Sequence, residues 1–384
     1  MNVGVRAPSG TVNPMNEPLL ERFHAVIPAG GTGTRLWPLS RAAAPKFLHD
    51  LTGSGTALIR STYDRLTPLA GNSIMVVTGR AHGAAVSAQL PALTVGNLVL
   101  EPSPKDSAAA IGLAAAILYR RDPDTIMGSF AADQVIVPVE AFQQSVVEAV
   151  RIAATDKIVT IGITPTYPST GFGYIRCGEP LDVEGAPNGR NVAEFVEKPE
   201  EEAAQQYLAS GQFLWNAGMF VAPVALMLKH LRANQPELAA GVEKIADAWD
   251  TEHRDHVIEE VWPTLPGIAI DYAVAEPAAA AGDVAVVPGD FTWDDVGDFA
   301  ALGRLNPAAD ETGTTVLGEG ARVYVDQASG IVVSDTKRVI ALIGIDDVVV
   351  VDTPDALLVT TKDHAQQVKG AVEALKAHGE TDVL

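Results

Sequence analysis

The sequence contains a single cysteine, Cys177, among 384 residues. One cysteine cannot form a disulfide within the chain, so a disulfide-stabilised fold is excluded and nothing in the cysteine count indicates secretion. No apolar run approaches the roughly 18 residues of a membrane-spanning helix, and residues 1–20 lack the apolar core of a signal peptide. We therefore expect a cytoplasmic protein with no membrane partner, in which the polar segment 1–20 is a disordered leader.

Basic residues are also scarce. Lysine and arginine number 27 against 48 aspartates and glutamates, which gives a formal net charge of −21. A nucleic-acid-binding protein needs a basic surface to neutralise phosphates, so this balance disfavours DNA or RNA as a partner. The 47% of hydrophobic residues is enough for a substantial core, and the length suits one large domain and one smaller domain.

Short apolar runs alternate with helix-like segments in the first half of the chain. This alternation predicts an α/β fold around a Rossmann-like mixed or parallel sheet, with ligands at the carboxyl ends of the strands. The expected strands are Phe23–Pro28, Ile74–Thr78, Asn97–Glu101, Thr125–Ala132 and Lys157–Ile163. The expected helices are Gly55–Leu66, Arg80–Leu90, Ser107–Arg120, Val139–Thr155, Pro199–Ser210 and Pro236–Asp250.

The texture of the sequence changes after about Asn306. Runs of β-branched residues broken by glycine and aspartate fill residues 314–351, and a helical pattern follows at about 363–378. We therefore expect a catalytic domain at 21–306 and a smaller β-rich C-terminal domain at 307–384 that ends in a helix.

A glycine-rich loop follows the first expected strand, with the sequence Pro28-Ala29-Gly30-Gly31-Thr32-Gly33-Thr34-Arg35-Leu36. Glycines let backbone N–H groups approach phosphate oxygens closely, and Arg35 and the later Lys46 add positive charge. A Walker A loop would end in Gly-Lys-Ser/Thr, and a Rossmann fingerprint would have a third glycine in place of Leu36. The pattern predicts a phosphate-binding loop of another type. The alternative is a tight turn that only connects the strand to the following helix.

Together with Trp37–Arg41 and Pro45–Phe47, this loop resembles the signature of the sugar-phosphate nucleotidyltransferases, most closely that of the mannose-1-phosphate guanylyltransferases. The resemblance continues in order through short segments between about Phe23 and Leu302. They are Glu101-Pro102, Ala132-Asp133, Thr170–Ile175, Phe195–Pro199, Trp215–Phe220, Ile270–Val274 and Trp293–Gly297.

The resemblance implies a reaction of GTP with mannose 1-phosphate that gives GDP-mannose and pyrophosphate. The attacking phosphate oxygen is already anionic, so this chemistry needs positioning and charge neutralisation rather than a general base. The resemblance implies that Asp133 and Asp295 hold Mg²⁺ or another divalent cation, while Arg35 and Lys46 bind the triphosphate. Lys198 is assigned to the sugar phosphate and completes the catalytic set Arg35, Lys46, Asp133 and Lys198.

The remaining site residues form two groups that the resemblance implies. The nucleotide-binding candidates are Ala29, Gly30, Gly31, Thr32, Gly33, Thr34, Arg35, Lys46, Glu101 and Ser107. The candidates for binding the sugar phosphate are Gly173, Glu197, Lys198, Asn216 and Asp271.

Each of these residues also has an ordinary structural interpretation. Asp133 is a candidate helix N-cap, and Asp295 is a candidate turn cap with Asp294 as the competing metal ligand. The adjacent Glu197 and Lys198 would form a solvated ion pair. Asn216 would be a turn asparagine and Asp271 a helix N-cap.

Two departures from the resembled pattern leave the preferred base open. Gln134 stands where histidine is usual, and residues 105–109 are Lys-Asp-Ser-Ala-Ala where Arg-Asn-Thr-Ala-Pro is usual. The competing hypotheses are a different pair of nucleotide and hexose 1-phosphate, or a non-catalytic regulatory subunit that binds a nucleotide sugar. A glycosyltransferase is disfavoured because no Asp-x-Asp motif begins at Asp133.

The segment after 307 is too short for a sugar-phosphate isomerase domain and has no histidine-rich cluster. We therefore expect a monofunctional enzyme. We also expect the β-rich segment to pack against the catalytic domain or a second subunit, with a homodimer as the expected assembly.

Overall fold

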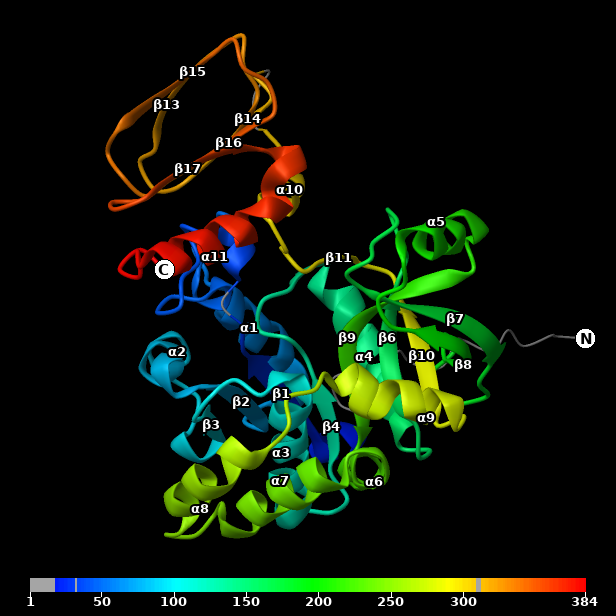
Figure 1. Cartoon of the computed structure of the whole chain (residues 1–384). Helices are drawn as coiled ribbons and strands as arrows, with labels where there is room; N and C mark the ends of the chain where they lie inside the picture. Colours follow the sequence, from blue (N-terminus) through cyan, green and yellow to red (C-terminus); the bar gives the residue numbers. More distant parts are fainter. Residues whose placement is uncertain (1–17, 32, 309–311) are drawn as a thin grey trace, which may run out of the picture.

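The computed structural model describes residues 18–31, 33–308 and 312–384. A large α/β domain carries a smaller β-rich domain, which lies at the top of Figure 1 in orange and red. This arrangement confirms the expected fold class. Helix α10 (Phe299–Leu305) precedes strand β12 (Thr314–Leu317), and Phe299 and Leu302 of this helix pack in one apolar cluster with residues of the C-terminal strands.

A nine-stranded sheet in the order β3-β2-β1-β4-β9-β6-β10-β8-β7 forms the centre of the large domain. Strands β3, β2, β1 and β4 are parallel, whereas β9 runs antiparallel to β4 and β6, so the sheet is mixed. The strands are β1 (Phe23–Ala29), β2 (Ile74–Gly79), β3 (Leu98–Glu101), β4 (Ile126–Ser129), β6 (Ile158–Ile163), β7 (Gly173–Pro180), β8 (Arg190–Val196), β9 (Phe213–Pro223) and β10 (Val284–Gly289).

Helices cover both faces of this sheet (Figure 1). One apolar cluster joins the sheet to α1 (Leu58–Ala70) and α4 (Val139–Ala153), and a second joins its other face to α3, α6 and α7. Helix α3 is buried from Ala108 to Leu118, and its many alanines allow this close packing. The remaining bounds are α2 (Gly83–Gln89), α3 (Asp106–Arg121), α5 (Glu201–Ser210), α6 (Val224–Asn234), α7 (Pro236–Ala248), α8 (Arg254–Val261) and α9 (Glu276–Ala280).

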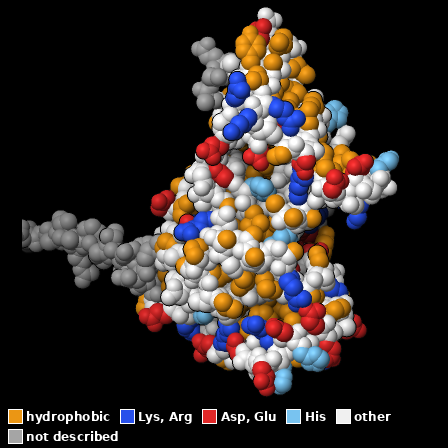
Figure 2. All heavy atoms as spheres, turned by 90° about the vertical axis from the view of Figure 1, so that its left-hand side faces the viewer, with side chains coloured by type: hydrophobic (Ala, Val, Ile, Leu, Met, Phe, Trp, Pro, Cys, Tyr) orange, Lys and Arg blue, Asp and Glu red, His pale blue; other side chains and the backbone are white. Residues whose placement is uncertain are grey.

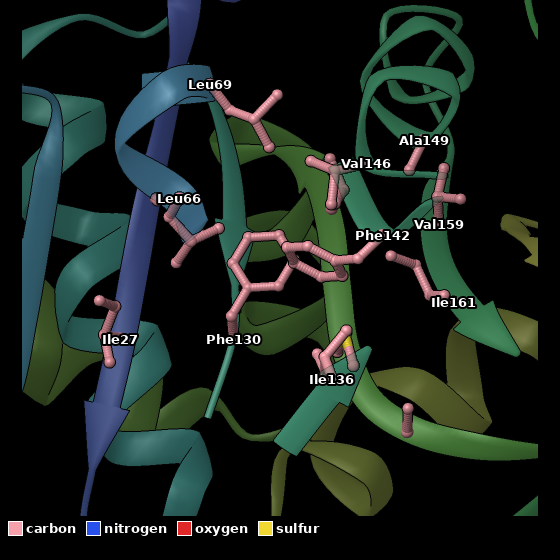
Figure 3. Close-up of a cluster of buried hydrophobic side chains, with 14 of the residues drawn as sticks. Ile27, Leu66, Leu69, Phe130, Ile136, Phe142, Val146, Ala149, Val159 and Ile161 are labelled. Atoms are coloured by element: carbon pink, nitrogen blue, oxygen red, sulfur yellow. The ribbon is translucent and has the colours of Figure 1, made fainter. Parts of the chain in front are cut away.

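The core beneath the carboxyl edge of the sheet is aromatic. Phe130 and Phe142 meet edge to face with ring centroids 5.6 Å apart, and Leu66 and Val146 surround them (Figure 3). Burying one such side chain stabilises the fold by roughly 2–3 kcal/mol. The packing fixes the chain immediately after β4, which is the segment that carries Asp133.

The expected leader ends earlier than the sequence suggested. Pro18–Arg22 form a 3₁₀ helix in which Leu20 is buried against the core. The Arg22 guanidinium donates to the carbonyl oxygen of Asp124 at 3.0 Å (Nε). The prediction of disorder was therefore wrong for residues 18–20, because one apolar residue anchors the turn, and residues 1–17 lie outside the described part of the chain.

The C-terminal domain is a coil of short parallel strands. Thr314 pairs with Gly330, and Gly330 pairs with Val348, so β12, β14 and β16 stack in register, and β17 closes this sheet antiparallel to β16. Strands β13 and β15 form the second wall of the coil. The bounds are β13 (Arg322–Asp326), β14 (Gly330–Ser334), β15 (Val339–Ile343), β16 (Val348–Asp352), β17 (Leu357–Thr361), the 3₁₀ helix η9 (Lys362–Gln367) and α11 (Val368–His378). Among the described helices, none is long and apolar enough to cross a membrane.

Candidate functional site

The glycine-rich loop leaves the carboxyl end of β1, at the centre of the parallel part of the sheet. Gly31 and Gly33 have φ values of +80° and +63°, a conformation that other residues adopt only with strain. A Cβ atom on Gly33 would lie 2.9 Å from Cβ of Lys46, so glycine at this position lets the segment that carries Lys46 approach the loop. Thr32, another nucleotide-binding candidate, lies outside the described residues.

The ammonium group of Lys46 joins the two candidate metal ligands. Its Nζ atom lies 2.6 Å from Oδ2 of Asp133 and donates to the backbone oxygen of Asp295 at 2.5 Å. The pairing of β5 (Val135–Val137) with β11 (Thr292–Asp294) places these aspartates together, because Asp294 is opposite Val135. Three segments far apart in the sequence thus meet at one point.

The two neighbouring aspartates have different environments. The Asp294 carboxylate accepts from the backbone N–H of Val296 at 2.7 Å and faces Arg304 at 3.5 Å, so Asp294 is the residue that caps the turn. Among the described residues, no donor bonds to the Asp295 carboxylate. Burial raises the pKa of Asp295, and the Lys46 charge opposes that shift.

Asp133 and Asp295 fit a divalent cation by their chemistry. Mg²⁺ takes hard oxygen ligands, commonly one or two carboxylates, and completes its shell with water and phosphate oxygens. In the described part of the chain no cluster of three or more candidate metal ligands occurs, so a metal in this protein would depend on substrate oxygens as well.

Arg65, which no sequence motif singled out, supports the Asp133 turn from α1. Its Nη2 atom donates to the backbone oxygen of Gln134 at 2.8 Å and to Oγ1 of Thr62, which donates in turn to the backbone oxygen of Ala132 at 3.3 Å. The backbone carbonyl groups of Ala132 and Gln134, on either side of Asp133, therefore both accept hydrogen bonds from α1. Burial lowers the pKa of Arg65 to about 10, so the buried side chain keeps its charge at neutral pH. The sequence signal that could have identified Arg65 is an arginine on the apolar face of a helix.

Gln134, one of the departures from the resembled pattern, has a structural role here. Its side chain is buried, and Nε2 donates to the backbone oxygen of Ala217 at 2.9 Å. This bond ties the Asp133 turn to β9.

Glu101 lies at the same edge of the sheet as the glycine-rich loop, since it pairs with Gly79 at the end of β2. Its Oε1 atom is buried without a hydrogen-bond partner, and burial raises the pKa of Glu101 to about 7. Ser107, the other base-side candidate, accepts a hydrogen bond from the backbone N–H of Ile270 at 2.9 Å. The Ser107 hydroxyl therefore connects the start of α3 with the segment that leads into Asp271.

The candidates for the sugar phosphate form a second cluster. The Glu197 side chain is only 4% exposed and its Oε1 lies 2.8 Å from Nζ of Lys198, so the solvated-pair interpretation is wrong for Glu197. Its Oε2 is buried without a partner, and burial raises the pKa of Glu197. A Cβ atom on Gly173 would lie 2.5 Å from that oxygen, so glycine makes room for the carboxyl group.

Asn216 and Asp271 complete this cluster. Asn216 accepts from the Thr160 hydroxyl at 3.0 Å and donates through Nδ2 to Oδ1 of Asp271 at 2.7 Å. Asp271 opens a π-helical turn (Asp271–Ala275) whose N-cap residue is Ile270. The N-cap interpretation of Asp271 was wrong, because its carboxylate bonds to a side chain on β9 instead of to the helix end.

Asp295 also lines an aromatic pocket of about 540 Å³. Tyr167, Phe172, Trp215 and Trp293 line it. Trp215 and Asn216 are consecutive residues of β9 and point to opposite faces of the sheet. The pocket and the Glu197–Asp271 cluster therefore lie on opposite sides of β9.

Arg35 is exposed, and its charge is among those that act on the Asp295 carboxyl group. Its Nη1 atom donates at 2.9 Å to Oε1 of Gln366, which belongs to the C-terminal domain. The structure thus brings Lys46, Asp133 and Asp295 together and joins Arg35 to the small domain, while Glu197, Lys198, Asn216 and Asp271 form a separate cluster.

Comparisons with known proteins agree with this arrangement. Residues 24–312 match the family model described as nucleotidyl transferase, and residues 320–375 match the MannoseP isomerase/GMP-like beta-helix domain. A mannose-1-phosphate guanylyltransferase of Escherichia coli K12 is 37% identical over 93% of this chain and 74% of its own length. The xanthan biosynthesis protein XanB of Xanthomonas campestris strain B100 is 36% identical over the same shares.

Solved structures agree with the same fold. A Thermus thermophilus protein titled mannose-1-phosphate geranyltransferase superposes with a TM-score of 0.80 and 31% identity, covering 92% of this chain and 99% of its own. A mannose-6-phosphate isomerase of Helicobacter pylori, at 21% identity and a TM-score of 0.58, shares the fold over 71% of this chain and 99% of its own.

The buried carboxyl group of Glu101 predicts a specific dependence of stability on pH. An unfolded glutamate ionises near 4.5, whereas the pKa of Glu101 in the folded protein is about 7, so the folded state holds an extra proton between these values. The free energy of unfolding should therefore fall as pH rises through this window, by about 3 kcal/mol more in the wild type than in Glu101→Gln. Urea unfolding of both proteins at pH 5 and pH 8 measures this, and parallel losses would contradict it.

Proposed function

This chain belongs to the nucleotidyl transferase family, and on that premise we propose that it transfers GMP from GTP to mannose 1-phosphate, forming GDP-mannose and releasing pyrophosphate. Its relatives support its assignment as a sugar-1-phosphate nucleotidyltransferase, since several of them are named mannose-1-phosphate guanylyltransferase. The observation that carries the proposal is the contact of Lys46 with Asp133 and Asp295 beside the glycine-rich loop.

The proposed reaction needs no general base, because the attacking phosphate oxygen is already anionic. An ammonium group has three N–H donors, and Lys46 uses two on Asp133 and Asp295. The third is available to a phosphate oxygen of the triphosphate. Arg35 adds a second positive charge, and the backbone N–H groups of residues 30, 31, 33 and 34 complete the phosphate contacts.

The family generally uses divalent cations, and in this chain Asp133 and Asp295 would hold the ion. When bound, such a cation supplies positive charge to the phosphate groups. The chain's own residues fix the carboxylates for it, since Arg65 and Thr62 hold the turn around Asp133 and Asp294 caps the turn that contains Asp295.

Glu101 supports guanine as the base. A carboxylate only accepts hydrogen bonds, and the Watson–Crick edge of guanine presents two donors, N1–H and the N2 amino group. Adenine presents a ring acceptor at N1, which an ionised carboxylate disfavours. The Oε1 atom of Glu101 is buried without a partner, and the two donors of guanine would favour the ionised form of this carboxyl group, whose pKa burial raises to about 7.

On the sugar side, we assign Lys198 to the phosphate and the Glu197, Asn216 and Asp271 side chains to the hydroxyl groups. The ammonium group of Lys198 is half exposed, while the Glu197 carboxylate is buried, so the cation faces outward and the acceptor lies beneath it. Hydroxyl recognition needs such fixed acceptors, and Asn216 holds Asp271 in place.

Pyrophosphate release with Mg²⁺ tests the function. GTP, ATP, UTP and dTTP are each offered with mannose, glucose and other hexose 1-phosphates. Release confined to GTP with mannose 1-phosphate supports the proposal, release with another pair overturns the substrate assignment, and no release from folded protein overturns the function.

Asp295→Asn should lower kcat on the order of 100-fold or more, because it removes charge from the ligand of the cation that neutralises the phosphates. Asp294→Asn is the matched control, since asparagine still accepts from the Val296 N–H and should keep near-normal turnover. The opposite ranking of the two variants would show that Asp294 is the ligand.

Lys198→Met should raise the KM for the sugar phosphate on the order of ten- to a hundred-fold and leave the KM for GTP nearly unchanged, because only the sugar phosphate loses a charged partner. Lys244→Met, which breaks an exposed ion pair with Glu260 far from the cluster, is the control. An unchanged dependence on sugar-phosphate concentration rules out the assigned role.

A homodimer is the assembly that we propose. Large apolar side chains are more than half exposed on the C-terminal domain, and Figure 2 shows hydrophobic side chains gathered over that domain, at the top of the view. Such patches are typical of interfaces. They include Tyr324 at 58%, Val339 at 60%, Ile343 at 65%, Leu357 at 56% and Val359 at 60% exposure. Sedimentation velocity should give twice the protomer mass of 40.2 kDa, and a single-protomer species at micromolar concentration would contradict the dimer.

A further inference from the structure

The segment after the glycine-rich loop is attached to the C-terminal domain at three places. Arg35 donates to Gln366 at 2.9 Å, the Trp37 indole donates to the backbone oxygen of Val383 at 2.7 Å, and Arg41 donates to both carboxylate oxygens of Asp355 at 2.6 Å. Figure 1 shows α11, in red, beside this blue part of the chain. The β-rich domain therefore contacts the phosphate-binding segment directly, across more than 300 residues of sequence.

The two arginines differ in how many N–H donors remain for a ligand. Arg41 forms four hydrogen bonds: a bidentate pair with Asp355 and one bond to the Thr353 hydroxyl at 3.2 Å. The fourth goes from Nε to the backbone oxygen of Pro38 at 3.0 Å. Arg35 has one described bond, through a single Nη1 donor. A guanidinium has five N–H donors, so four of those on Arg35 remain for phosphate oxygens.

Asp298 fixes the orientation of the Gln366 amide group by binding its nitrogen. Its Nε2 group donates to Oδ2 of Asp298, while Oδ1 of Asp298 accepts from the backbone N–H of Ala301 at 2.8 Å and caps α10. Because a carboxylate can only accept, it selects the amide nitrogen and turns the amide oxygen toward Arg35. Asp298 lies three residues after Asp295, so Gln366 bridges the phosphate-binding arginine and the loop that carries a candidate metal ligand.

We propose that Gln366 is a positioning residue that holds the Arg35 guanidinium at the triphosphate, so that docking of the C-terminal domain completes the active site. This inference rests on the proposed transfer reaction. A free arginine side chain loses rotamer entropy when it is ordered, and a partner that fixes one N–H removes part of that cost before the substrate binds. The neutral amide also leaves the full positive charge of Arg35 for the phosphates, which a carboxylate partner would not.

Gln366→Met removes both amide bonds and keeps a side chain of similar length. With GTP, mannose 1-phosphate and Mg²⁺, kcat should fall on the order of ten-fold, the effect of losing one hydrogen bond to a charged group. In an Arg35→Met background the same substitution should cause no further loss, because the residue acts through Arg35.

Exchanging the donor and the acceptor between residues 366 and 298 tests whether turnover depends on the hydrogen bonds of Gln366 and not only on the volume of its side chain. Gln366→Glu places two carboxylates together and should stay impaired. Adding Asp298→Asn restores a donor opposite the introduced carboxylate, and asparagine still caps α10, so the double variant should recover part of the lost kcat. A merely structural role for Gln366 predicts instead that Gln366→Met lowers kcat further in the Arg35→Met background.

Asp355→Ala is the matched control, since it breaks the Arg41 pair between the same two domains without touching Arg35. It should keep wild-type kcat. Normal turnover in Gln366→Met, with Arg35→Met impaired, overturns the proposal, and so does an Asp355→Ala loss equal to that of Gln366→Met.

If wild-type protein shows no turnover with any substrate pair, the proposed function fails while the inference stays testable. Calorimetric binding of inorganic pyrophosphate with Mg²⁺ then supplies the readout. Weaker binding in both Gln366→Met and Arg35→Met, with Asp355→Ala like wild type, supports the positioning role, and wild-type affinity in Gln366→Met overturns it.

Discussion

The ion pair between Lys46 and Asp133, with its bond to the Asp295 backbone, is the contact on which the site depends. It fixes the end of β4, the turn after β11 and the segment after the glycine-rich loop relative to one another. The Lys46 side chain is 10% exposed, so the charges interact with little screening by water. A buried ammonium without these partners would be costly, and the three segments are therefore held together as one unit.

The site contains several of the few basic residues of a chain whose net charge is −21. Arg65 lies beneath the Asp133 turn, Lys198 covers the buried Glu197, and Arg35 extends toward the C-terminal domain. Anionic substrates must bind against the overall negative field, so the few basic side chains at the site matter more. The scarcity of basic residues therefore makes the placement of each one more informative.

Much of the fold followed from the sequence because its signals are local. Apolar runs and helical periodicity located most of the elements, and β-branched runs located the C-terminal coil. The candidate site was harder, because its residues meet through pairings such as Asp294 opposite Val135, which no local pattern encodes. The same reason explains why Gln366 gave no signal, and why the N-cap interpretation of Asp271 failed once Asn216 provided a partner.

The most direct test of the account is to locate the divalent cation. Crystals grown with Mn²⁺ and GDP-mannose allow the ion to be found by its anomalous scattering. We expect one strong peak whose protein ligands are the carboxylates of Asp133 and Asp295, with Lys46 and Arg35 on the phosphate side. A peak held by other residues, or by Asp294 in place of Asp295, would contradict it.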